Sequence, residues 1–397
     1  MAPARVYMDW NATAPLGEPA RLAMLGALQL PGNASSVHSE GRAARAALEK
    51  ARRQVAALVN ADPAHVIFTS GATEAANHVL TPEFRMGRSV LKIGRLYVSA
   101  VEHPAVREGG RFPAEAVTEV RVTSSGIVDM DALAAALEDH DKASGLPMVA
   151  LMLANNETGV IQPVAEAAEL VHRHGGLIIV DAVQAVGRMP VDLEALGADF
   201  LLLSSHKLAG PKGVGALVSR GESLMPAPLV RGGGQEKGHR SGTENLHGII
   251  GFGAAAEAAG ADIAQRLTAM TTLRNRLEDG MRRAAPDVIV HGEGVERIAN
   301  TCFFSLPGLK SETGQIAFDL EGIAISAGSA CSSGRVGQSH VLSAMGFDPE
   351  LGGLRISMGP GTSGADVEVT LAAFEKIARR RRPAGEVALA RSKHAES

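Results

Sequence analysis

The order of apolar and polar positions along the chain predicts helices that alternate with short buried strands. Residues 38–59 carry apolar side chains at helical spacing, and residues 66–69 (VIFT) follow as a short strand. Further strands are predicted at 96–101, 148–154, 177–181, 200–204 and 214–218. Short apolar runs separated by helices are typical of a mostly parallel sheet covered on both faces. The pattern therefore predicts an α/β fold.

The hydrophobic pattern changes near residue 260. Residues 261–285 predict a long amphipathic helix. Two strands and a final helix are predicted after it, at 302–306, 323–328 and 367–381. A chain of 397 residues exceeds the roughly 250–300 residues that a single core usually serves. We therefore expect a large domain at 16–260 and a smaller α+β domain built from 1–15 and 261–397.

Composition and charge argue against several classes of function. The 39 basic and 43 acidic residues give a net charge of −4, so no global attraction to nucleic acid or anionic lipid is expected. The one basic run, 379–382, is interpreted as a solvated helix end, with a docking patch as the alternative. The sequence has neither a signal-peptide pattern nor a stretch of about 18 apolar residues. We therefore expect a cytoplasmic protein that binds neither nucleic acid nor membrane.

The two cysteines are too few for a disulfide framework, so each needs its own explanation. Cys302 lies in an apolar strand pattern and is expected to be buried and inert. Cys331 lies in a stretch rich in Gly and Ser, which suits a mobile arm that carries a nucleophile. A free thiol in such a loop is a liability unless its reactivity is used. We interpret Cys331 as reactive, with a structural role as the alternative.

The segment after the strand at 66–69 has the residue types of a phosphate cradle. The residues GATE occupy 71–74, where small side chains expose backbone N–H groups at a predicted helix start and Thr73 adds a hydroxyl group. Backbone N–H groups at a helix N-terminus bind anions. A plain helix cap by Thr73 and Glu74 is the alternative.

Two further strand ends carry charged side chains. Asp181 ends the strand at 177–181, and the strand at 200–204 leads into Lys207. A lysine at the inner end of a buried strand is costly unless it is paired or used, although a surface lysine is the alternative. Ligands collect at the carboxyl ends of the strands in an open parallel sheet. An acid, a lysine and a phosphate cradle predict one site for pyridoxal phosphate, with Lys207 as the Schiff-base lysine.

The residues at these positions resemble the class V, fold-type I pyridoxal-phosphate enzymes, and within them the cysteine desulfurases of the NifS and IscS type. The resemblance covers nearly the whole chain. It is carried by YMDWNATAP, SSVHSEGR, VEHPAV, NNETGVIQPV, VDAVQAVG, SSHKLAGPKGVGA, RSGTEN and GSACSSG. The resemblance implies a homodimer with a large cofactor-binding domain and a smaller domain that carries the Cys331 loop.

The resemblance implies roles for individual residues. Lys207 would bind the cofactor covalently, Asp181 would pair with its pyridine nitrogen, Gln184 would contact its phenolic oxygen and His103 would stack on its ring. Phosphate contacts are implied for the Ala72 backbone, Thr73, Ser204 and His206, and for Thr243 from the other subunit. No metal is implied.

The substrate side of the site is implied in the same way. Asn156 resembles a ring or substrate contact, and Arg355 matches the arginine that holds the substrate carboxylate, a task suited to its bidentate fork. Lys207 would remove the α proton, and Cys331 would attack the substrate sulfur. Alanine would leave after reprotonation with help from His103 or Lys207.

The implied function is the conversion of L-cysteine to L-alanine, with the sulfur held as a persulfide on Cys331. The spacing from Cys331 to 341–342 suggests the long-loop desulfurases, which deliver sulfur to an acceptor such as an iron–sulfur scaffold protein; tRNA thiolation is another possible destination. Other class V activities, a selenocysteine lyase or an aminotransferase, are the first alternative. A non-catalytic protein that keeps the fold for binding is the second.

The chain departs from the family pattern at two places. Trp10 replaces a small polar residue in MDWNATAP. Gly359, Pro360 and Gly361 stand where the family usually has an arginine soon after the segment that resembles RISMG. The departure at 359–361 concerns local substrate contacts, whereas the sequence assigns no effect to Trp10.

Overall fold

The computed structural model describes residues 5–328 and 338–381. Cys331, the predicted nucleophile, lies outside these residues. The largest sheet of the described structure has nine strands. Its order is β10 (Leu224–Pro226), β3 (Glu83–Met86), β4 (Ser89–Ser99), β6 (Leu146–Met152), β7 (Leu177–Asp181), β8 (Phe200–Ser204), β9 (Gly215–Ser219) and β2 (Val66–Thr69), with β5 (Val117–Val120) beside β4.

The centre of this sheet is parallel. β4, β6, β7 and β8 are parallel neighbours, and β5 pairs in parallel with β4. β3 and β9 run against the other strands. Asp181 pairs in register with Met152 on one side and Leu202 on the other, so the three central strands end at the same edge. The predicted mostly parallel α/β fold is confirmed.

Helices cover both faces of the sheet because its strands are apolar on both sides. In β7, Ile178 and Val180 belong to one hydrophobic core, whereas Leu177 and Ile179 belong to another on the opposite face. The first core includes side chains of α2 (Ser39–Leu58), α5 (Met130–Glu138), α6 (Val164–Arg173) and α7 (Leu246–Gly260). The second includes side chains of α3 (Ala72–Val79) and α4 (Pro104–Arg107).

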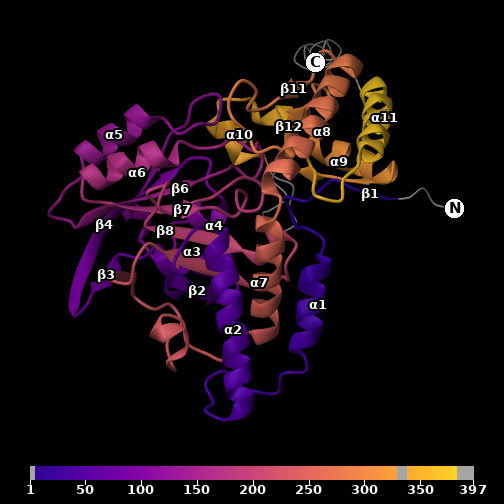
Figure 1. Ribbon diagram of the computed structural model, residues 1–397. Coiled ribbons are helices and arrows are strands. Elements are labelled where there is room, and N and C mark those ends of the chain that lie inside the picture. The colour runs from indigo at the N-terminus through magenta and orange to yellow at the C-terminus, as the bar shows by residue number, and fades with distance from the viewer. Residues whose placement is uncertain (1–4, 329–337, 382–397) are drawn as a thin grey trace, which may run out of the picture.

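The C-terminal part has its own core, formed together with the N-terminal strand. Its four-stranded sheet has the order β11 (Ile289–Val290), β12 (Thr301–Ser305), β15 (Leu354–Ser357) and β14 (Ser326–Ala327). Beside it, β1 (Val6–Tyr7) pairs in parallel with β13 (Ile323–Ala324). The helices of this part are α8 (Ile263–Ala284), α9 (Ser311–Leu320), α10 (His340–Ala344) and α11 (Gly364–Arg380). Figure 1 shows α8, α9 and α11 together at the upper right, beside β1.

The boundary near residue 260 stays a prediction. α7 ends at Gly260 and α8 begins at Ile263, so the chain passes from one helix to the next at this point. Figure 1 shows α7 beside the large sheet and α8 rising toward the C-terminal part.

Two local features differ from the expected elements. α1 (Glu18–Ala27), which the hydrophobic pattern did not single out, packs against α7. Residues 323–328, expected to form one strand, form two, because β13 pairs with β1 whereas β14 pairs with β15. A period-two pattern does not show where a chain changes partners.

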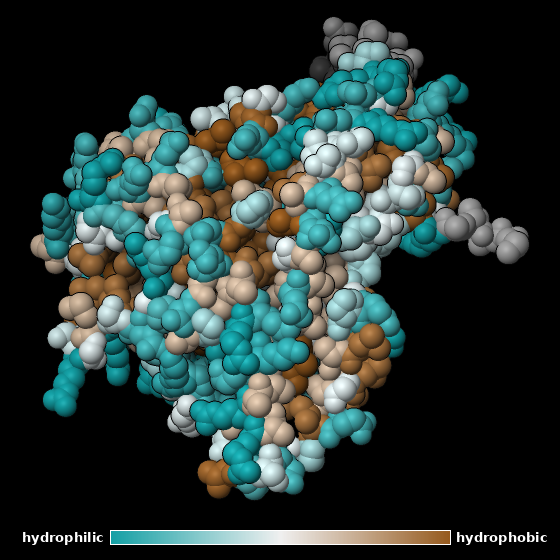
Figure 2. Space-filling model, in the orientation of Figure 1, coloured by the Kyte–Doolittle hydropathy of each residue, from teal (hydrophilic) through white to brown (hydrophobic). Residues whose placement is uncertain are grey.

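The surface over α1 is partly apolar. Leu22, Leu25 and Leu28 expose 55%, 48% and 61% of their area. Figure 2 shows brown surface at the lower right, where Figure 1 places this helix. Brown surface also shows at the upper centre and at the left of this view, among teal and pale residues. Among the described helices, none combines the length and hydropathy that crossing a membrane would need.

Candidate active site

A cavity of about 500 Å³ lies at the carboxyl ends of β6, β7 and β8. Its size suits a small-molecule ligand. The cavity brings together most of the residues singled out in the sequence: Ala72, Thr73, His103, Asn156, Asp181, Gln184, Ser204, His206 and Lys207. Two other candidates do not line it: Arg355 contacts Asn156, and Thr243 lines a neighbouring cavity. Cys331 is outside the described residues.

Asp181 stands at the end of β7 with one oxygen committed to the protein. Its Oδ1 accepts a hydrogen bond of 2.9 Å from the Val183 amide. Burial raises the pKa of Asp181 to about 6, against the opposing effects of that bond and of Lys207. Because the charged form is disfavoured by burial, a cationic ligand group at this carboxylate would restore its ionisation.

Lys207 is held by the N-terminal segment. It lies in a short 3₁₀ turn, Ser205–Leu208, directly after β8. Its Nζ donates to the carbonyl oxygens of Asn11 at 2.6 Å and Ala12 at 2.9 Å. These contacts place the amine at the cavity, between the carboxyl end of β8 and residues that come from the other end of the chain.

His103 is the N-cap residue of α4, and its imidazole is neutral near pH 7. Its Nδ1 accepts a hydrogen bond of 3.1 Å from the Ala105 amide. Burial, together with Lys207, lowers the pKa of His103 to about 4. A neutral imidazole whose Nδ1 accepts must carry its proton on Nε2. His103 is therefore a flat, uncharged group with one donor.

The predicted phosphate cradle after β2 combines the N-terminus of α3 with an acid, Glu74, that already has partners within the protein. Gly71 precedes the first residue of α3, Ala72, and both line the cavity with Thr73. Glu74 instead accepts from the Ser70 amide at 2.8 Å and pairs with Arg240 at 2.9 Å. Glu74 also lines the cavity, but its carboxylate already has these partners and caps the helix start.

His206 and Ser204 lie at the same end of β8. His206 Nδ1 is 3.2 Å from Thr13 Oγ1, and burial next to Lys207 lowers the pKa of His206 to about 4. Ser204 is buried at the last position of the strand. Lys212, which the sequence pattern had not singled out, also lines the cavity and adds a positive charge to it.

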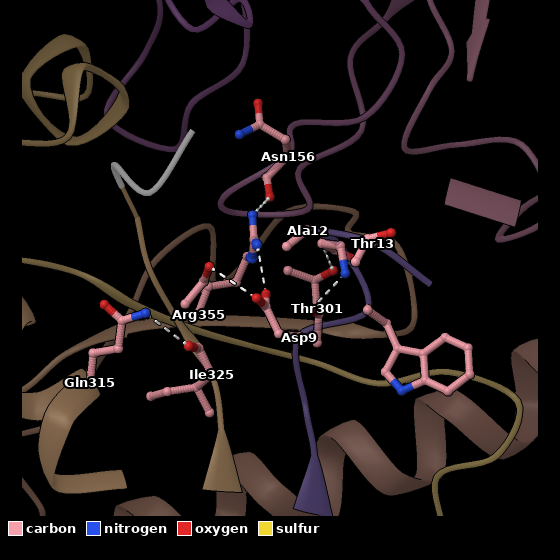
Figure 3. Close-up of polar contacts among 12 residues, drawn as sticks. Asp9, Ala12, Thr13, Asn156, Thr301, Gln315, Ile325 and Arg355 are labelled. Atoms are coloured by element: carbon pink, nitrogen blue, oxygen red, sulfur yellow. Dashed lines mark hydrogen bonds and ion pairs between the residues drawn. The ribbon is translucent and has the colours of Figure 1, made fainter. Parts of the chain in front are cut away.

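Arg355 is buried and joins three parts of the chain. Its Nη1 donates to the Asn156 carbonyl at 2.7 Å, and its Nη2 pairs with Asp9 Oδ1 at 2.9 Å. Figure 3 shows the Arg355 side chain between Asn156 and Asp9. Arg355 Nε and Asn156 Oδ1 are both buried, and neither has a hydrogen-bond partner within the described residues. This end of the site thus holds an unpaired donor and an unpaired acceptor, and Figure 3 shows the Asn156 side-chain amide pointing away from Arg355.

Thr243 lies outside the main cavity. It is exposed and lines a neighbouring cavity of about 230 Å³, which shares Ser70 and Gly213 with the first. Thr243 is therefore a neighbour of the cradle and does not line the main cavity.

Two buried carboxyl groups behind the site had not been foreseen. Glu102 accepts from the Met152 amide at 2.6 Å, and burial next to Asp181 raises its pKa well above the usual range. Burial raises the pKa of Glu157 to about 7, and its Oε2 accepts from Ser339 Oγ at 2.5 Å. Glu102 precedes His103 and Glu157 follows Asn156, two residues that the sequence had singled out. The sequence therefore marked these carboxyl groups only by their position next to other candidates.

Cys302 is buried in β12 with no exposed surface, and burial raises the pKa of its thiol. The expectation that this cysteine is buried is confirmed. A thiol with a raised pKa carries little thiolate and is therefore a poor nucleophile.

The two departures from the family pattern touch each other. A Cβ added to Gly359 would lie 2.0 Å from Trp10 Cδ2, so the indole occupies the space that a side chain at 359 would need. Trp10 and Gly359 also line a second cavity of about 230 Å³ behind Lys207. The change at position 10 and the missing side chain at 359 form a single packing arrangement.

Comparison with known proteins identifies the family of this fold and site. The sequence model of the class-V aminotransferase family matches residues 6–369. A cysteine desulfurase of Cereibacter sphaeroides is 40% identical over 94% of this chain and 95% of its own length. The cysteine desulfurase IscS of Dictyoglomus turgidum is 38% identical over 94% of each chain.

Solved structures give the same result. A NifS-like protein from Rickettsia africae superposes with a TM-score of 0.83 and 30% identity, covering 94% of this chain and 99% of that protein. The chain therefore belongs to the class-V aminotransferase family, and its similarity extends to the NifS-like and IscS-like cysteine desulfurases.

Proposed function

We propose that this protein is a cysteine desulfurase that uses pyridoxal 5'-phosphate, converts L-cysteine to L-alanine and transfers the sulfur to Cys331. The observation that carries the proposal is the cavity at the ends of β6, β7 and β8, where Asp181, Lys207 and the cradle of α3 meet. Relatives named cysteine desulfurases match the chain over nearly its whole length.

The residues around the cavity fit pyridoxal phosphate. The Ala72 and Thr73 amides at the start of α3 suit a phosphate, with Ser204 and His206 beside them. Asp181 suits a protonated pyridine nitrogen, and Gln184 suits the phenolic oxygen. Asn156 Oδ1, which is buried without a partner in the described structure, suits a donor on the ring or on the substrate. When bound, the cofactor supplies an electron sink for the charge that develops at the substrate α carbon.

The chain's own residues supply the proton transfers and the substrate contacts. Lys207 Nζ takes the proton from the substrate α carbon, and the Asn11 and Ala12 carbonyls hold this amine at the cavity. His103, which carries its proton on Nε2, helps to return a proton to the product. Arg355 binds the substrate carboxylate, which would give its unpaired Nε an acceptor.

Sulfur transfer is assigned to Cys331. Its thiolate attacks the substrate sulfur, so that an S–S bond forms as the C–S bond breaks, and the carbon keeps the electron pair and gains a proton to become alanine. Gly328 and Ser339 flank the segment that contains this cysteine, and both lie against Glu157: a Cβ at Gly328 would meet Glu157 Oε2 at 2.8 Å. Both of these described residues therefore lie against Glu157, which follows the cavity-lining Asn156 in the sequence.

A pair of cysteine variants tests this function. Purified wild type, Cys331→Ala and the matched control Cys302→Ala are compared for visible cofactor absorbance and for release of alanine and sulfide from cysteine. We expect all three to bind the cofactor, and only Cys331→Ala to lose product release. Full activity of Cys331→Ala would contradict the mechanism. Amino-group transfer to a keto acid, or cleavage of selenocysteine in place of cysteine, would favour the other class-V activities.

We also propose a homodimer in which Thr243 of each subunit contacts the phosphate bound by the other. Two features support it: Thr243 is exposed beside the cradle, and α1 carries exposed leucines of a kind that subunit interfaces cover. Sedimentation should give a dimer. Mixing Lys207→Ala with Thr243→Ala subunits should restore part of the activity, because one of the two sites would then be intact.

The sulfur held on Cys331 requires an acceptor. We propose a sulfur-acceptor protein, such as an iron–sulfur scaffold, in the cytoplasm, where thiols stay reduced. Transfer of labelled sulfur from the loaded enzyme to a purified scaffold tests this assignment.

A further inference from the structure

Arg188 lies directly behind the proposed cofactor site. It belongs to the turn that follows β7, and it lines the second cavity of about 230 Å³ with Trp10 and Lys207. Its Nη1 donates to the main-chain oxygen of Gln184 at 2.9 Å and to Gln184 Oε1 at 2.5 Å. Its Nη2 lies 3.4 Å from the Lys207 carbonyl and 3.5 Å from the Trp10 carbonyl.

These contacts are unusual for an arginine because every acceptor is an uncharged oxygen. Within residues 5–328 and 338–381, Arg188 forms no ion pair with a carboxylate. Burial, together with Arg355, lowers the pKa of Arg188 to about 9. Placing a cation here without a counter-ion is costly, so its contacts with Gln184 and Lys207 call for an explanation.

The contact with Gln184 decides which way its amide points. A guanidinium has donors only, so the atom of Gln184 that faces it must be the oxygen. Gln184 Nε2 then donates to the Asn11 carbonyl at 3.1 Å and keeps a second hydrogen. Gln184 lines the main cavity, so this hydrogen is the one available to a ligand there.

We propose that Arg188 is a positioning residue that fixes the Gln184 amide with its N–H group toward the cavity, so that Gln184 can only donate to an anionic oxygen of the bound ligand. The inference rests on the proposed function, in which that oxygen is the phenolic oxygen of pyridoxal phosphate. Without Arg188 only the Asn11 carbonyl holds the amide in this orientation, so the amide rotates more readily and can present its own oxygen, which would repel the ligand oxygen. The same guanidinium also contacts the Lys207 carbonyl, so Arg188 helps to position both Gln184 and Lys207.

Arginine suits this role because its planar fork reaches several acceptors at once. One branch bonds Gln184 twice, and the other reaches toward the two carbonyls. A lysine would supply donors from a single point, so Arg188→Lys should restore only part of the effect of arginine. Methionine has a similar length and no donor, which makes Arg188→Met the informative change.

The first test is the pH dependence of the visible absorbance of the holoprotein. A donor to the ring oxygen competes with the proton that this oxygen shares with the lysine nitrogen, so losing the donor should raise the midpoint of the spectral change. We expect Arg188→Met to raise it by on the order of one pH unit. The matched control is Arg266→Met, because Arg266 lines the same second cavity but bonds the Ala258 and Ala259 carbonyls.

A double-mutant cycle separates positioning from general structural support. Gln184→Met alone should raise the midpoint by as much as Arg188→Met does, and combining the two should add nothing. Additive shifts, an unchanged midpoint in Arg188→Met, or an equal shift in the Arg266→Met control would overturn the proposal. A shift in Arg188→Lys smaller than that in Arg188→Met would support it.

A second measurement needs no cofactor. The side-chain amide resonance of Gln184 in the apoprotein, labelled with ¹⁵N glutamine, should show slowed hydrogen exchange in wild type and faster exchange in Arg188→Met. Equal exchange would overturn the positioning role. If exchange changes as expected but the protein takes up no pyridoxal phosphate, the positioning role stands and the proposed function fails.

Discussion

The two walls of the main cavity are built differently. The strand-end wall, which follows β2, β7 and β8, lines the cavity with groups suited to a ligand: Asp181, Thr73 and the start of α3. The supporting wall consists of residues 12 and 13, with Asp9, Asn11, Arg188 and Arg355 behind them, and most of its polar groups are bonded within the protein. The first wall is organised to receive a ligand, and the second to hold the first in place.

The largest effect is expected from removing the amine on the strand-end wall. Lys207→Ala should lower alanine release by about 10³-fold or more, because the group that moves the α proton is lost. The Asn11 and Ala12 carbonyls lose their donor but stay at the cavity edge, so the fold should persist. Rates and far-ultraviolet circular dichroism are measured together. A folded variant with wild-type turnover would contradict the assigned role.

Substitutions in the supporting wall should lower the free energy of unfolding. Asp9→Ala leaves the Arg355 cation buried without its counter-ion, since Arg355 is only 2% exposed. Removing one partner of a buried pair costs about 3–5 kcal/mol of unfolding free energy. Arg121→Ala is the control, because it breaks a more exposed pair with Asp129 and should cost about 0–1 kcal/mol. If urea denaturation gave equal losses of unfolding free energy for the two variants, the buried pair would be no more important than the exposed one.

The pH dependence of cofactor binding tests Asp181. Its pKa is raised from 3.8 to about 6, so the carboxylate needed by a cationic ring nitrogen is present above that pH and is lost below it. Uptake of pyridoxal phosphate by the apoprotein should therefore weaken as pH falls through about 6. The same raised pKa makes the apoprotein lose stability as pH rises from 3.8 to about 6.

Asp181→Asn is the matched variant for both pH effects. Its uptake of cofactor should be weaker at pH 8 and should lack the part of the pH dependence that Asp181 causes. An unchanged profile in Asp181→Asn would assign the dependence to another group, such as the phosphate itself.

The smallest effect is expected where Trp10 packs on Gly359. Gly359→Ala forces the indole aside and should cost about 1–3 kcal/mol of unfolding free energy. Adding Trp10→Ser should recover most of that loss, because the space at 359 is then open. Thermal unfolding of the two single variants and the double variant checks this. Additive losses would show that the two positions are independent.

The difference between the strand-end wall and the supporting wall also explains which features the sequence could predict. Asp181 ends an apolar strand, and Lys207 and Thr73 come shortly after one. Because parallel strands end at one edge, local pattern was enough to bring the three together. The roles of individual side chains came from the family resemblance. The contact of Trp10 with Gly359 and the pairing of Asp9 with Arg355 join residues about 350 positions apart, which local pattern does not reveal.

Backbone contacts were equally hidden. Lys207 is held by the carbonyls of Asn11 and Ala12, and main-chain acceptors leave no mark on residue type. Arg188 was passed over for a different reason: its motif, VDAVQAVG, ends one residue before it. Glu102 and Glu157 required burial to be known before their raised pKa values could be inferred.

The central claim is that Cys331 receives the sulfur of cysteine. Its most direct test is a single turnover with isotopically labelled cysteine, followed by mass spectrometry of the peptides that contain Cys331 and Cys302. We predict one labelled sulfur atom on Cys331, none on Cys302 and one alanine released for each sulfur bound. Alanine release with no labelled sulfur on Cys331 would contradict the account.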